Sequence, residues 1–161
     1  MTQVYEGSFD GKRLRAAVVA SRFNETVGKR LVEGALDCLK RHGVADGDVS
    51  VVWVPGAFEL PAAAMRLASS GEVDAVVCVG AVIRGETAHF DYVAGHACNG
   101  IGEVALRTGI PVTLGVLTTE NTEQAMERAG GKAGNKGFEA ALAALEMVNL
   151  FSSLPKPASD I

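Results

Sequence analysis

The chain has 161 residues, of which 48 % are hydrophobic and 21 % charged, with a formal net charge of −4. This composition is ordinary for a globular protein of one domain, and the absence of a basic cluster argues against nucleic-acid binding. No apolar run approaches the ~20 residues that span a bilayer, so no membrane association is expected. The N-terminus lacks the features of a signal peptide, and Cys38, Cys78 and Cys98 are expected to be buried free thiols. We therefore expect a cytoplasmic protein.

Short apolar runs alternate with stretches of helical periodicity along the chain. Asn24 is expected to cap the first helix and Gly43 to end it, and Asn121 with Gln124 resembles a capping box. The glycine-rich segment 130–137 is expected to be a loop. In chain order we predict a strand at 15–20, a helix from 24 to 42, strands at 49–54 and 75–83 with a short helix at 61–68 between them, a helix at 89–107, a strand at 112–117, and helices at 121–129 and 138–151.

This order predicts an α/β fold: a single-domain three-layer sandwich, with a flavodoxin-like parallel sheet of about four strands and helices on both faces. The domain is expected to span residues 1–161, with a peripheral N-terminal arm at 1–12 and a peripheral C-terminal tail at 152–161. Sheets of this kind place ligands beyond the carboxyl ends of their strands. Polar residues follow each predicted strand, at 21–24, 55–59, 84–89 and 118–121.

The turn at 84–89 is the most informative of these segments. Backbone N–H groups near Gly85 and Thr87, at a helix N-terminus, suit an anion such as phosphate. His89 can exchange a proton near neutral pH. A helix-start position would explain His89 structurally, but its neighbours favour a functional role. An anion site beside a proton carrier is the outline of an active site.

Other candidate residues have a structural interpretation beside the functional one. The position of Phe23 is equally consistent with a core aromatic and with a platform on which a flat heterocycle stacks. Glu59 fits a helix N-terminus slightly better than a ligand contact. Arg128 and Lys136, taken singly, fit surface charges better than phosphate ligands. His96 alone fits a structural or surface histidine.

Several familiar motifs are incomplete. The segment 130–137 lacks the Walker spacing and its hydroxyl residue, and Gly95, Gly100 and Gly102 miss the dinucleotide fingerprint. Ser21 lacks the flanking glycines of the nucleophile elbow of serine hydrolases. No group of Cys and His residues has the spacing of a zinc site. Kinase-type, dinucleotide-binding and serine-hydrolase functions are therefore unsupported, and no metal site is expected.

Four blocks, at 20–24 (ASRFN), 54–61 (VPGAFELP), 83–91 (IRGETAHFD) and 127–137, make the chain similar to the lumazine synthase family. The resemblance extends from residue 5 to residue 151. It implies condensation of 5-amino-6-ribitylaminouracil with 3,4-dihydroxy-2-butanone 4-phosphate to 6,7-dimethyl-8-ribityllumazine in riboflavin biosynthesis. Phosphate and water are released, and neither a metal nor an organic cofactor is implied.

The resemblance also implies site residues. His89 as proton shuttle and Arg128 as phosphate clamp are the implied catalytic residues. The implied substrate-binding residues are Phe23 for stacking on the pyrimidine, Gly56, Ala57, Phe58 and Glu59 for the ribityl chain, Val82 and Ile83 for backbone contacts to the ring, Gly85, Glu86 and Thr87 for the phosphate, and Leu114, Lys136 and Glu139. Arg128, Lys136 and Glu139 would come from an adjacent subunit, so the implied enzyme is a homo-oligomer with shared sites.

The sequence departs from the family pattern at two of these positions. Leu114 stands where many relatives have an aromatic residue, which makes the second side of the ring sandwich aliphatic. Glu86 puts an acid into the phosphate turn, where we expect its backbone to bind while its side chain faces solvent.

The resemblance implies a pentamer. Family members that pack pentamers into an icosahedral shell have a short loop at the position of 130–137, so the resemblance implies such a shell here, with a bare pentamer as the alternative. Residues 4–7 would add a strand to a neighbour's sheet. Riboflavin synthase is a further partner under this hypothesis. Three alternatives stay open: a non-catalytic flavin-binding or shell-forming protein, an enzyme converting lumazine to riboflavin, and, more distantly, a nucleotide-binding signalling domain. The presence of both His89 and Arg128 favours the lumazine-forming enzyme.

Overall fold

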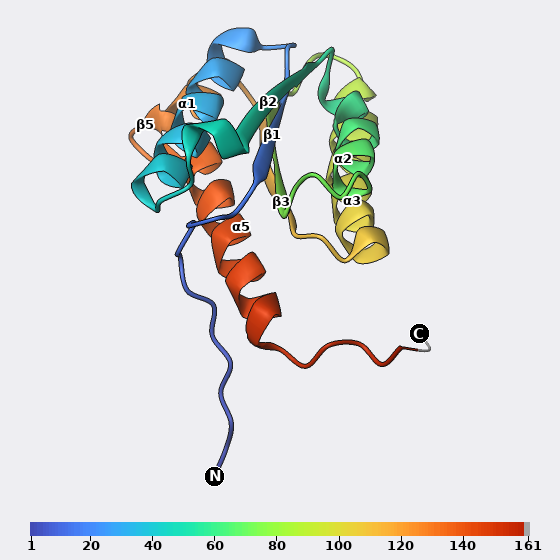
Figure 1. The fold of residues 1–161 in the computed structure, drawn as a ribbon. Helices are drawn as coiled ribbons and strands as arrows, with labels where there is room; N and C mark the ends of the chain where they lie inside the picture. The colour runs from blue at the N-terminus through green and yellow to red at the C-terminus, as the bar shows by residue number, and fades with distance from the viewer. Residues whose placement is uncertain (160–161) are drawn as a thin grey trace.

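The computed structural model describes residues 1–159, which form a three-layer α/β sandwich around a four-stranded sheet (Figure 1). The strands are β1 (Ala16–Ser21), β2 (Val49–Val54), β3 (Ala75–Ile83) and β4 (Val112–Thr119). Their order across the sheet is β2-β1-β3-β4, and all three pairings are parallel. The predicted fold class is confirmed, and each strand lies within two residues of its expected bounds.

Helices cover both faces of the sheet (Figure 1). The helices α1 (Glu25–Arg41), α4 (Thr122–Glu127) and α5 (Lys136–Ser153) lie on one face, and α2 (Leu60–Ala68) and α3 (His89–Thr108) on the other. Alternate residues of β1 therefore enter different cores: Val18 packs beneath α1 and α5, whereas Val19 packs beneath α2 and α3. Burial on both faces explains why residues 16–20 are all hydrophobic, and the only polar residue of β1 is Ser21 at its end.

The helix caps are partly as expected. Asn121 caps α4, because its side-chain Oδ1 accepts the Gln124 N–H at 2.8 Å, and Gly43 has a φ of 97° after α1. The expected side-chain cap by Asn24 is wrong. Asn24 has a left-handed backbone (φ 61°, ψ 47°), makes no cap hydrogen bond, and donates from its side-chain amide to the Ala81 carbonyl at 3.2 Å. Asn24 thus ties the start of α1 to β3 instead of capping the helix.

The glycine-rich segment at 130–137 contains structure that the sequence analysis did not predict. A small antiparallel hairpin forms between β5 (Ala129–Gly131) and β6 (Gly134–Asn135), with Gly130 and Gly134 at φ values of 101° and 85°. Asn135 then caps α5 by accepting the Phe138 N–H at 3.0 Å, so α5 begins two residues earlier than expected. Two short 3₁₀ turns, η1 (Asp46–Asp48) and η2 (Ala57–Glu59), were also not predicted.

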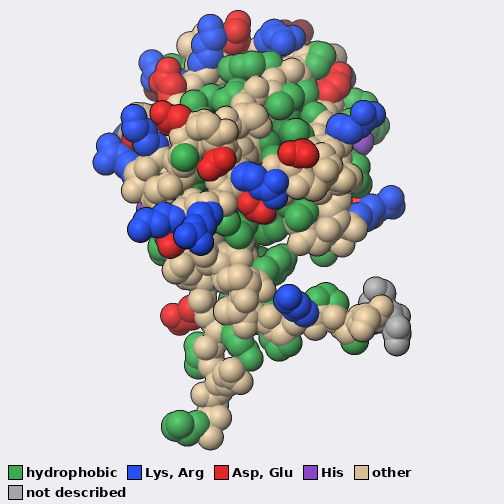
Figure 2. Space-filling view, in the orientation of Figure 1, with side chains coloured by type: hydrophobic (Ala, Val, Ile, Leu, Met, Phe, Trp, Pro, Cys, Tyr) green, Lys and Arg blue, Asp and Glu red, His purple; other side chains and the backbone are tan. Residues whose placement is uncertain are grey.

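Both chain ends extend away from the sandwich (Figure 1). The N-terminal arm is attached near its base, where the Asn149 side-chain amide donates to the carbonyls of Ser8 (3.0 Å) and Asp10 (2.9 Å). The Gly11 N–H donates to the His42 carbonyl at 2.8 Å. Residues before Gly7 are exposed. Figure 2 shows lysine, arginine and acidic side chains interspersed on the visible face, without a large patch of one sign.

Candidate active site

A cavity of about 670 Å³ lies beyond the carboxyl ends of β1, β2 and β3, on the face that α2 and α3 cover. This is the position at which parallel sheets bind ligands. Ten of the residues implied by the family resemblance line it together with five others. The fifteen lining residues are Phe23, Asn24, Pro55, Gly56, Ala57, Phe58, Glu59, Ala81, Val82, Ile83, Gly85, Thr87, His89, Phe90 and Val93.

Phe23 stands at the mouth of this cavity. The residue is 73 % exposed, which rules out the alternative of a core aromatic beneath the next helix. The Arg22 and Phe23 N–H groups donate to the carbonyls of Val54 (2.7 Å) and Pro55 (3.0 Å). These two bonds join the ends of β1 and β2, so the backbone of Phe23 is held beside the segment that follows β2. An exposed aromatic ring held this way can stack on a flat heterocycle.

The segment after β2 forms the next part of the wall. Gly56 is extended, and the Glu59 N–H donates to its carbonyl at 3.2 Å to close the η2 turn. Glu59 occupies the N-cap position of α2, as the structural interpretation expected, but its side chain makes no cap hydrogen bond and is exposed. The carboxylate is therefore hydrated at the edge of the cavity and available to accept hydrogen bonds from hydroxyl groups.

The turn between β3 and α3 closes the cavity on its third side. His89 is the first residue of α3 and is exposed, and its backbone N–H donates to Thr87 Oγ1 at 3.4 Å. Gly85, Thr87 and His89 all line the cavity, so the structure brings the expected anion site and proton carrier together. Glu86 differs, because it is exposed and does not line the cavity. Its expected solvent-facing side chain is consistent with this position.

The remaining implied residues lie elsewhere on the same chain. Arg128, Lys136 and Glu139 line a separate cavity of about 310 Å³ beside the end of β4, which shares no residue with the first. Arg128 donates from a guanidinium N–H to the Gln124 carbonyl at 3.2 Å. Leu114 is 40 % exposed on β4 and lines neither cavity. One chain thus carries most of the implied site as two separated halves, with Leu114 and Glu86 outside both.

Sequence reasoning missed five residues that line the larger cavity. Asn24 was interpreted as a helix cap, and Pro55 and Phe90 lie inside the matching blocks but were given no role. Ala81 and Val93 carry only an apolar signal, which does not distinguish a cavity wall from a core. Their positions depend on how the three strand ends converge, which a linear pattern does not encode.

The cysteines differ in burial. Burial raises the pKa of Cys78 to about 12, and burial together with the Asp37 charge raises that of Cys38 to about 11. Cys98 is only half-buried, so the expectation of three buried thiols is wrong at this position. Thiols with raised pKa values are poor nucleophiles. Within residues 1–159, no group of three or more His, Cys, Asp and Glu residues is arranged to hold a metal ion.

No helix in the described part of the chain has the length and hydropathy needed to cross a membrane.

Known proteins match the chain over almost its whole length. The model of the 6,7-dimethyl-8-ribityllumazine synthase family matches residues 13–152. The 6,7-dimethyl-8-ribityllumazine synthase of Chlorobium phaeobacteroides is 59 % identical over 146 residues, which cover 91 % of this chain and 94 % of that protein. The enzymes of the same name from Prosthecochloris aestuarii and Chlorobium phaeovibrioides are 56 % and 53 % identical, covering 92 % and 94 % of this chain and 96 % and 98 % of those proteins. The chain therefore belongs to the 6,7-dimethyl-8-ribityllumazine synthase family.

Proposed function

We propose that this chain condenses 5-amino-6-ribitylaminouracil with 3,4-dihydroxy-2-butanone 4-phosphate to 6,7-dimethyl-8-ribityllumazine, releasing phosphate and water. The observation that carries the proposal is the 670 Å³ cavity, where Phe23, Glu59 and His89 meet although they follow three different strands. Family membership supplies the reaction, and the cavity supplies a place for it in this chain.

The walls of the cavity suit the parts of the two substrates. The exposed ring of Phe23 would stack on the pyrimidine, with backbone groups of Val82 and Ile83 at the ring edge. The ribityl chain would follow segment 56–59, where the Glu59 carboxylate can accept its hydroxyl groups. The phosphate would lie at the N–H groups of the 85–87 turn, since the N-terminus of α3 favours an anion.

The proposed reaction proceeds through imine formation, elimination of phosphate, ring closure and dehydration. Each step moves protons, and His89 can accept and return them at the cavity wall. Binding both substrates side by side can supply up to ~7–11 kcal/mol of the barrier. Proximity is therefore the larger contribution, and proton transfer by His89 is the smaller one.

The two separated halves support a site that is shared between subunits. We propose that Leu114, Arg128, Lys136 and Glu139 of one subunit complete the cavity of the next. The three polar residues already lie together in one chain, and both Leu114 and Arg128 are accessible from outside it. Arg128 would then grip the phosphate from across the interface, because a guanidinium forms paired hydrogen bonds with phosphate oxygens.

Mixed oligomers test the sharing directly. Co-assembled His89→Ala and Arg128→Ala subunits should recover about one quarter of the wild-type sites, because some adjacent pairs combine an intact His89 with an intact Arg128. The control is a mixture of the two variants assembled separately. Activity equal to the mean of the two variants would contradict a shared site.

The proposed assembly is a pentamer that packs into an icosahedral shell. Segment 130–137 is short and contains most of the hairpin of β5 and β6. The exposed arm before Gly7 could add a strand to a neighbouring sheet. Light scattering and negative-stain microscopy test this. Particles no larger than a pentamer would exclude the shell, and a stable monomer would also contradict the shared site. Association with riboflavin synthase belongs to the same proposal and is tested by co-purification.

We also propose a cytoplasmic location, which the free thiols support because the cytoplasm is reducing.

The activity itself is tested by incubating the purified protein with both substrates. Lumazine fluorescence and release of inorganic phosphate should rise together. Formation of riboflavin from lumazine alone would identify the chain as an enzyme that converts lumazine to riboflavin. Binding of flavin without turnover would identify a non-catalytic protein.

A further inference from the structure

Arg84 joins the β3–α3 turn to the end of the neighbouring strand β4. Its backbone N–H donates to the Thr119 carbonyl at 2.8 Å, so the pairing of β3 with β4 continues one residue past the strand. Its guanidinium Nε lies 3.0 Å from one carboxylate oxygen of Glu120, and another guanidinium nitrogen lies 3.4 Å from Asp91 Oδ1. The guanidinium carbon lies 4.4 Å from the centre of the Phe90 ring, which lines the cavity.

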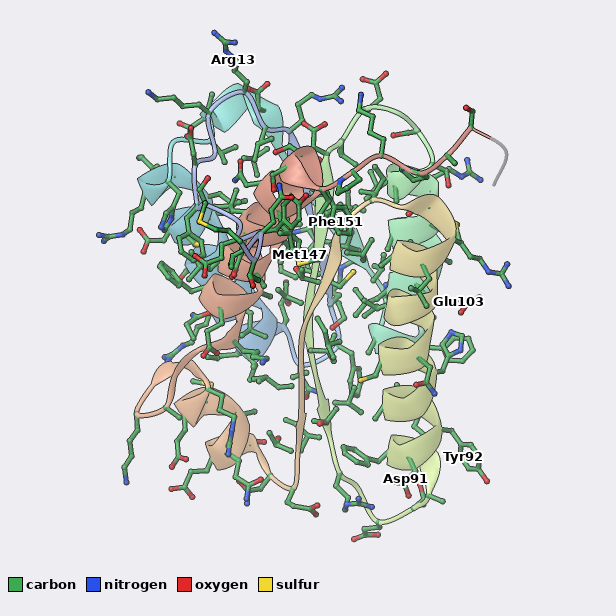
Figure 3. All side chains as sticks on the ribbon, turned by 90° about the horizontal axis from the view of Figure 1, so that it is seen from below. Arg13, Asp91, Tyr92, Glu103, Met147 and Phe151 are labelled. Carbon is green, nitrogen blue, oxygen red and sulfur yellow. The ribbon has the colours of Figure 1, made fainter. Side chains whose placement is uncertain are left out.

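These contacts come from both sides of the proposed phosphate turn. Arg84 immediately precedes the turn, whereas Phe90 and Asp91 follow it on the first turn of α3, where Figure 3 shows Asp91. Glu120 follows β4, the neighbouring strand. The Arg84 side chain therefore links the residues on both sides of the 85–89 turn to Glu120, which follows β4.

Arg84 also changes the charge around the turn. Asp91 and Glu120 are carboxylates close to a segment that would receive a phosphate, and each would repel it. A guanidinium between the two carboxylates compensates this repulsion, and its planar fork fixes both partners at once. Individual exposed ion pairs contribute little to stability, so the consequence is expected in ligand binding and not in folding.

We propose that Arg84 is a positioning residue for the phosphorylated substrate, which shapes the 85–89 turn through Phe90 and offsets the charges of Asp91 and Glu120. The inference rests on the proposed phosphate turn. In this proposal Arg84 acts through Phe90, Asp91 and Glu120 and not by direct contact with the substrate. Its loss should therefore weaken binding of the phosphate and leave binding of the pyrimidine unaffected.

The experiment compares steady-state kinetics and inhibition by inorganic phosphate for the variant Arg84→Gln. We expect the KM for the butanone phosphate and the inhibition constant of phosphate to rise about fivefold, on the scale of two exposed ion pairs, while the KM for the pyrimidine changes less than twofold. The double variant Arg84→Gln/Glu120→Gln should recover part of the loss, because one uncompensated carboxylate is removed. Raised salt should reduce the difference between Arg84→Gln and the wild type.

Two further variants make the outcomes distinct. Arg107→Gln removes an exposed ion pair with Glu103 on the same helix, far from the turn along α3, and should leave both KM values unchanged. Arg128→Gln reports on the phosphate site itself. If Arg128→Gln raises the phosphate constants and Arg84→Gln does not, the inference about Arg84 is wrong while the proposed function stands.

If neither Arg128→Gln nor Arg84→Gln affects the phosphate constants, the proposed phosphate site is wrong. An equal rise in both KM values of Arg84→Gln would assign the residue a general structural role and overturn the inference. Failure of Glu120→Gln to recover any affinity would overturn the charge-compensating part.

Discussion

The imidazole of His96 is stacked on the ring of Phe58, with ring centroids 4.0 Å apart and planes inclined by 24°. Phe58 is 54 % exposed and lines the cavity, and His96 lies on α3 seven residues after His89. The stack therefore connects the η2 segment to α3 beside the wall of the larger cavity. His96, which the sequence alone assigned to a structural or surface position, supports a residue proposed to hold the ribityl chain.

Replacing His96 with alanine should raise the KM for the ribityl-bearing pyrimidine several-fold with little change in kcat. A stacked ring pair contributes ~0.5–1.5 kcal/mol beyond the area it buries, and its loss frees the Phe58 side chain. His96→Phe should retain most of the affinity, because the stack is kept. Asn99→Ala, an exposed change on the same helix, is the matched control. Unchanged kinetics for His96→Ala would show that the stack has no part in binding.

His89→Ala should slow turnover by about ten- to a hundredfold without abolishing it, because proximity is retained and solvent can carry protons slowly. Arg128→Ala should lower kcat/KM further, because a charge-assisted phosphate contact is lost. Steady-state kinetics of both variants, with circular dichroism to verify folding, provide the comparison. Wild-type rates in both would exclude the roles assigned to these side chains.

Leu114→Phe should tighten binding of the pyrimidine or of riboflavin-like analogues. Leu114 is exposed on the edge strand β4, where its side chain is free to meet a neighbouring subunit. An aromatic ring on the second side of the ligand adds ~0.5–1.5 kcal/mol. Titration calorimetry on the assembled protein measures the change. Equal or weaker affinity would mean that Leu114 does not face the ring.

The sequence predicted the sheet well because its central strands, β1 and β3, are buried on both faces. A residue such as Val18 or Val19 must be apolar whichever side it faces, so continuous hydrophobicity identified the strands and the topology followed from the intervening helices. The positions of Phe23, Glu59 and His89 after strand ends then predicted that they converge, and all three line one cavity.

The errors have physical causes that the linear sequence does not show. Asn24 has the residue type of a cap, but its backbone is left-handed and its side-chain nitrogen donates to the Ala81 carbonyl, a contact with a distant strand that no local pattern reveals. The hairpin at 129–135 depends on the positive φ values of Gly130 and Gly134, which glycine permits but does not require. The network around Arg84 joins residues up to 36 positions apart in sequence, so it could be seen only in the folded chain.

Asp74 should make stability depend on pH in the acid range. Its carboxylate accepts the Arg15 backbone N–H at 2.8 Å and pairs with the Arg15 side chain at 3.2 Å. Burial alone would raise the pKa of Asp74, but the hydrogen bonds and charge of Arg15 outweigh it and lower that pKa. The stabilisation is therefore fully present above the ordinary aspartate pKa of about 3.9 and is lost as pH falls through the lower pKa of the folded state.

Urea titrations at a series of pH values measure this contribution. Asp74→Asn should reduce the free energy of unfolding at neutral pH by about 1 kcal/mol, since the pair is partly exposed and screened, and the difference from wild type should vanish in strong acid. Asp37→Asn, which removes the exposed pair with Arg41 on α1, is the control and should show a smaller effect. A difference that stays constant across the pH range would contradict the ionic origin.

Gly80 and Ser21 should show strong energetic coupling. Ser21 is fully buried at the end of β1, and its Oγ has no hydrogen-bond partner among the described residues. A Cβ at Gly80 on β3 would overlap that Oγ, whereas the Ser21 Cβ would be 3.1 Å away. We therefore expect Ser21→Ala to raise the free energy of unfolding by about 1 kcal/mol, because an unpaired buried hydroxyl is removed. Gly80→Ala should lower it by about 1–3 kcal/mol through overpacking.

The double variant decides whether this single contact explains both effects. With alanine at position 21, the new methyl group at position 80 needs only a shift of a few tenths of an ångström, so Gly80→Ala should cost much less than in the wild type. Denaturation of all four proteins at one concentration gives the coupling energy, which should exceed about 1 kcal/mol. Additive effects would show that the β1–β3 contact is not what excludes a side chain at Gly80. Although Ser21 directly precedes Arg22 and Phe23, the backbone N–H groups of those two residues are held by the carbonyls of Val54 and Pro55, so relief of this contact should leave the cavity and the KM values unchanged.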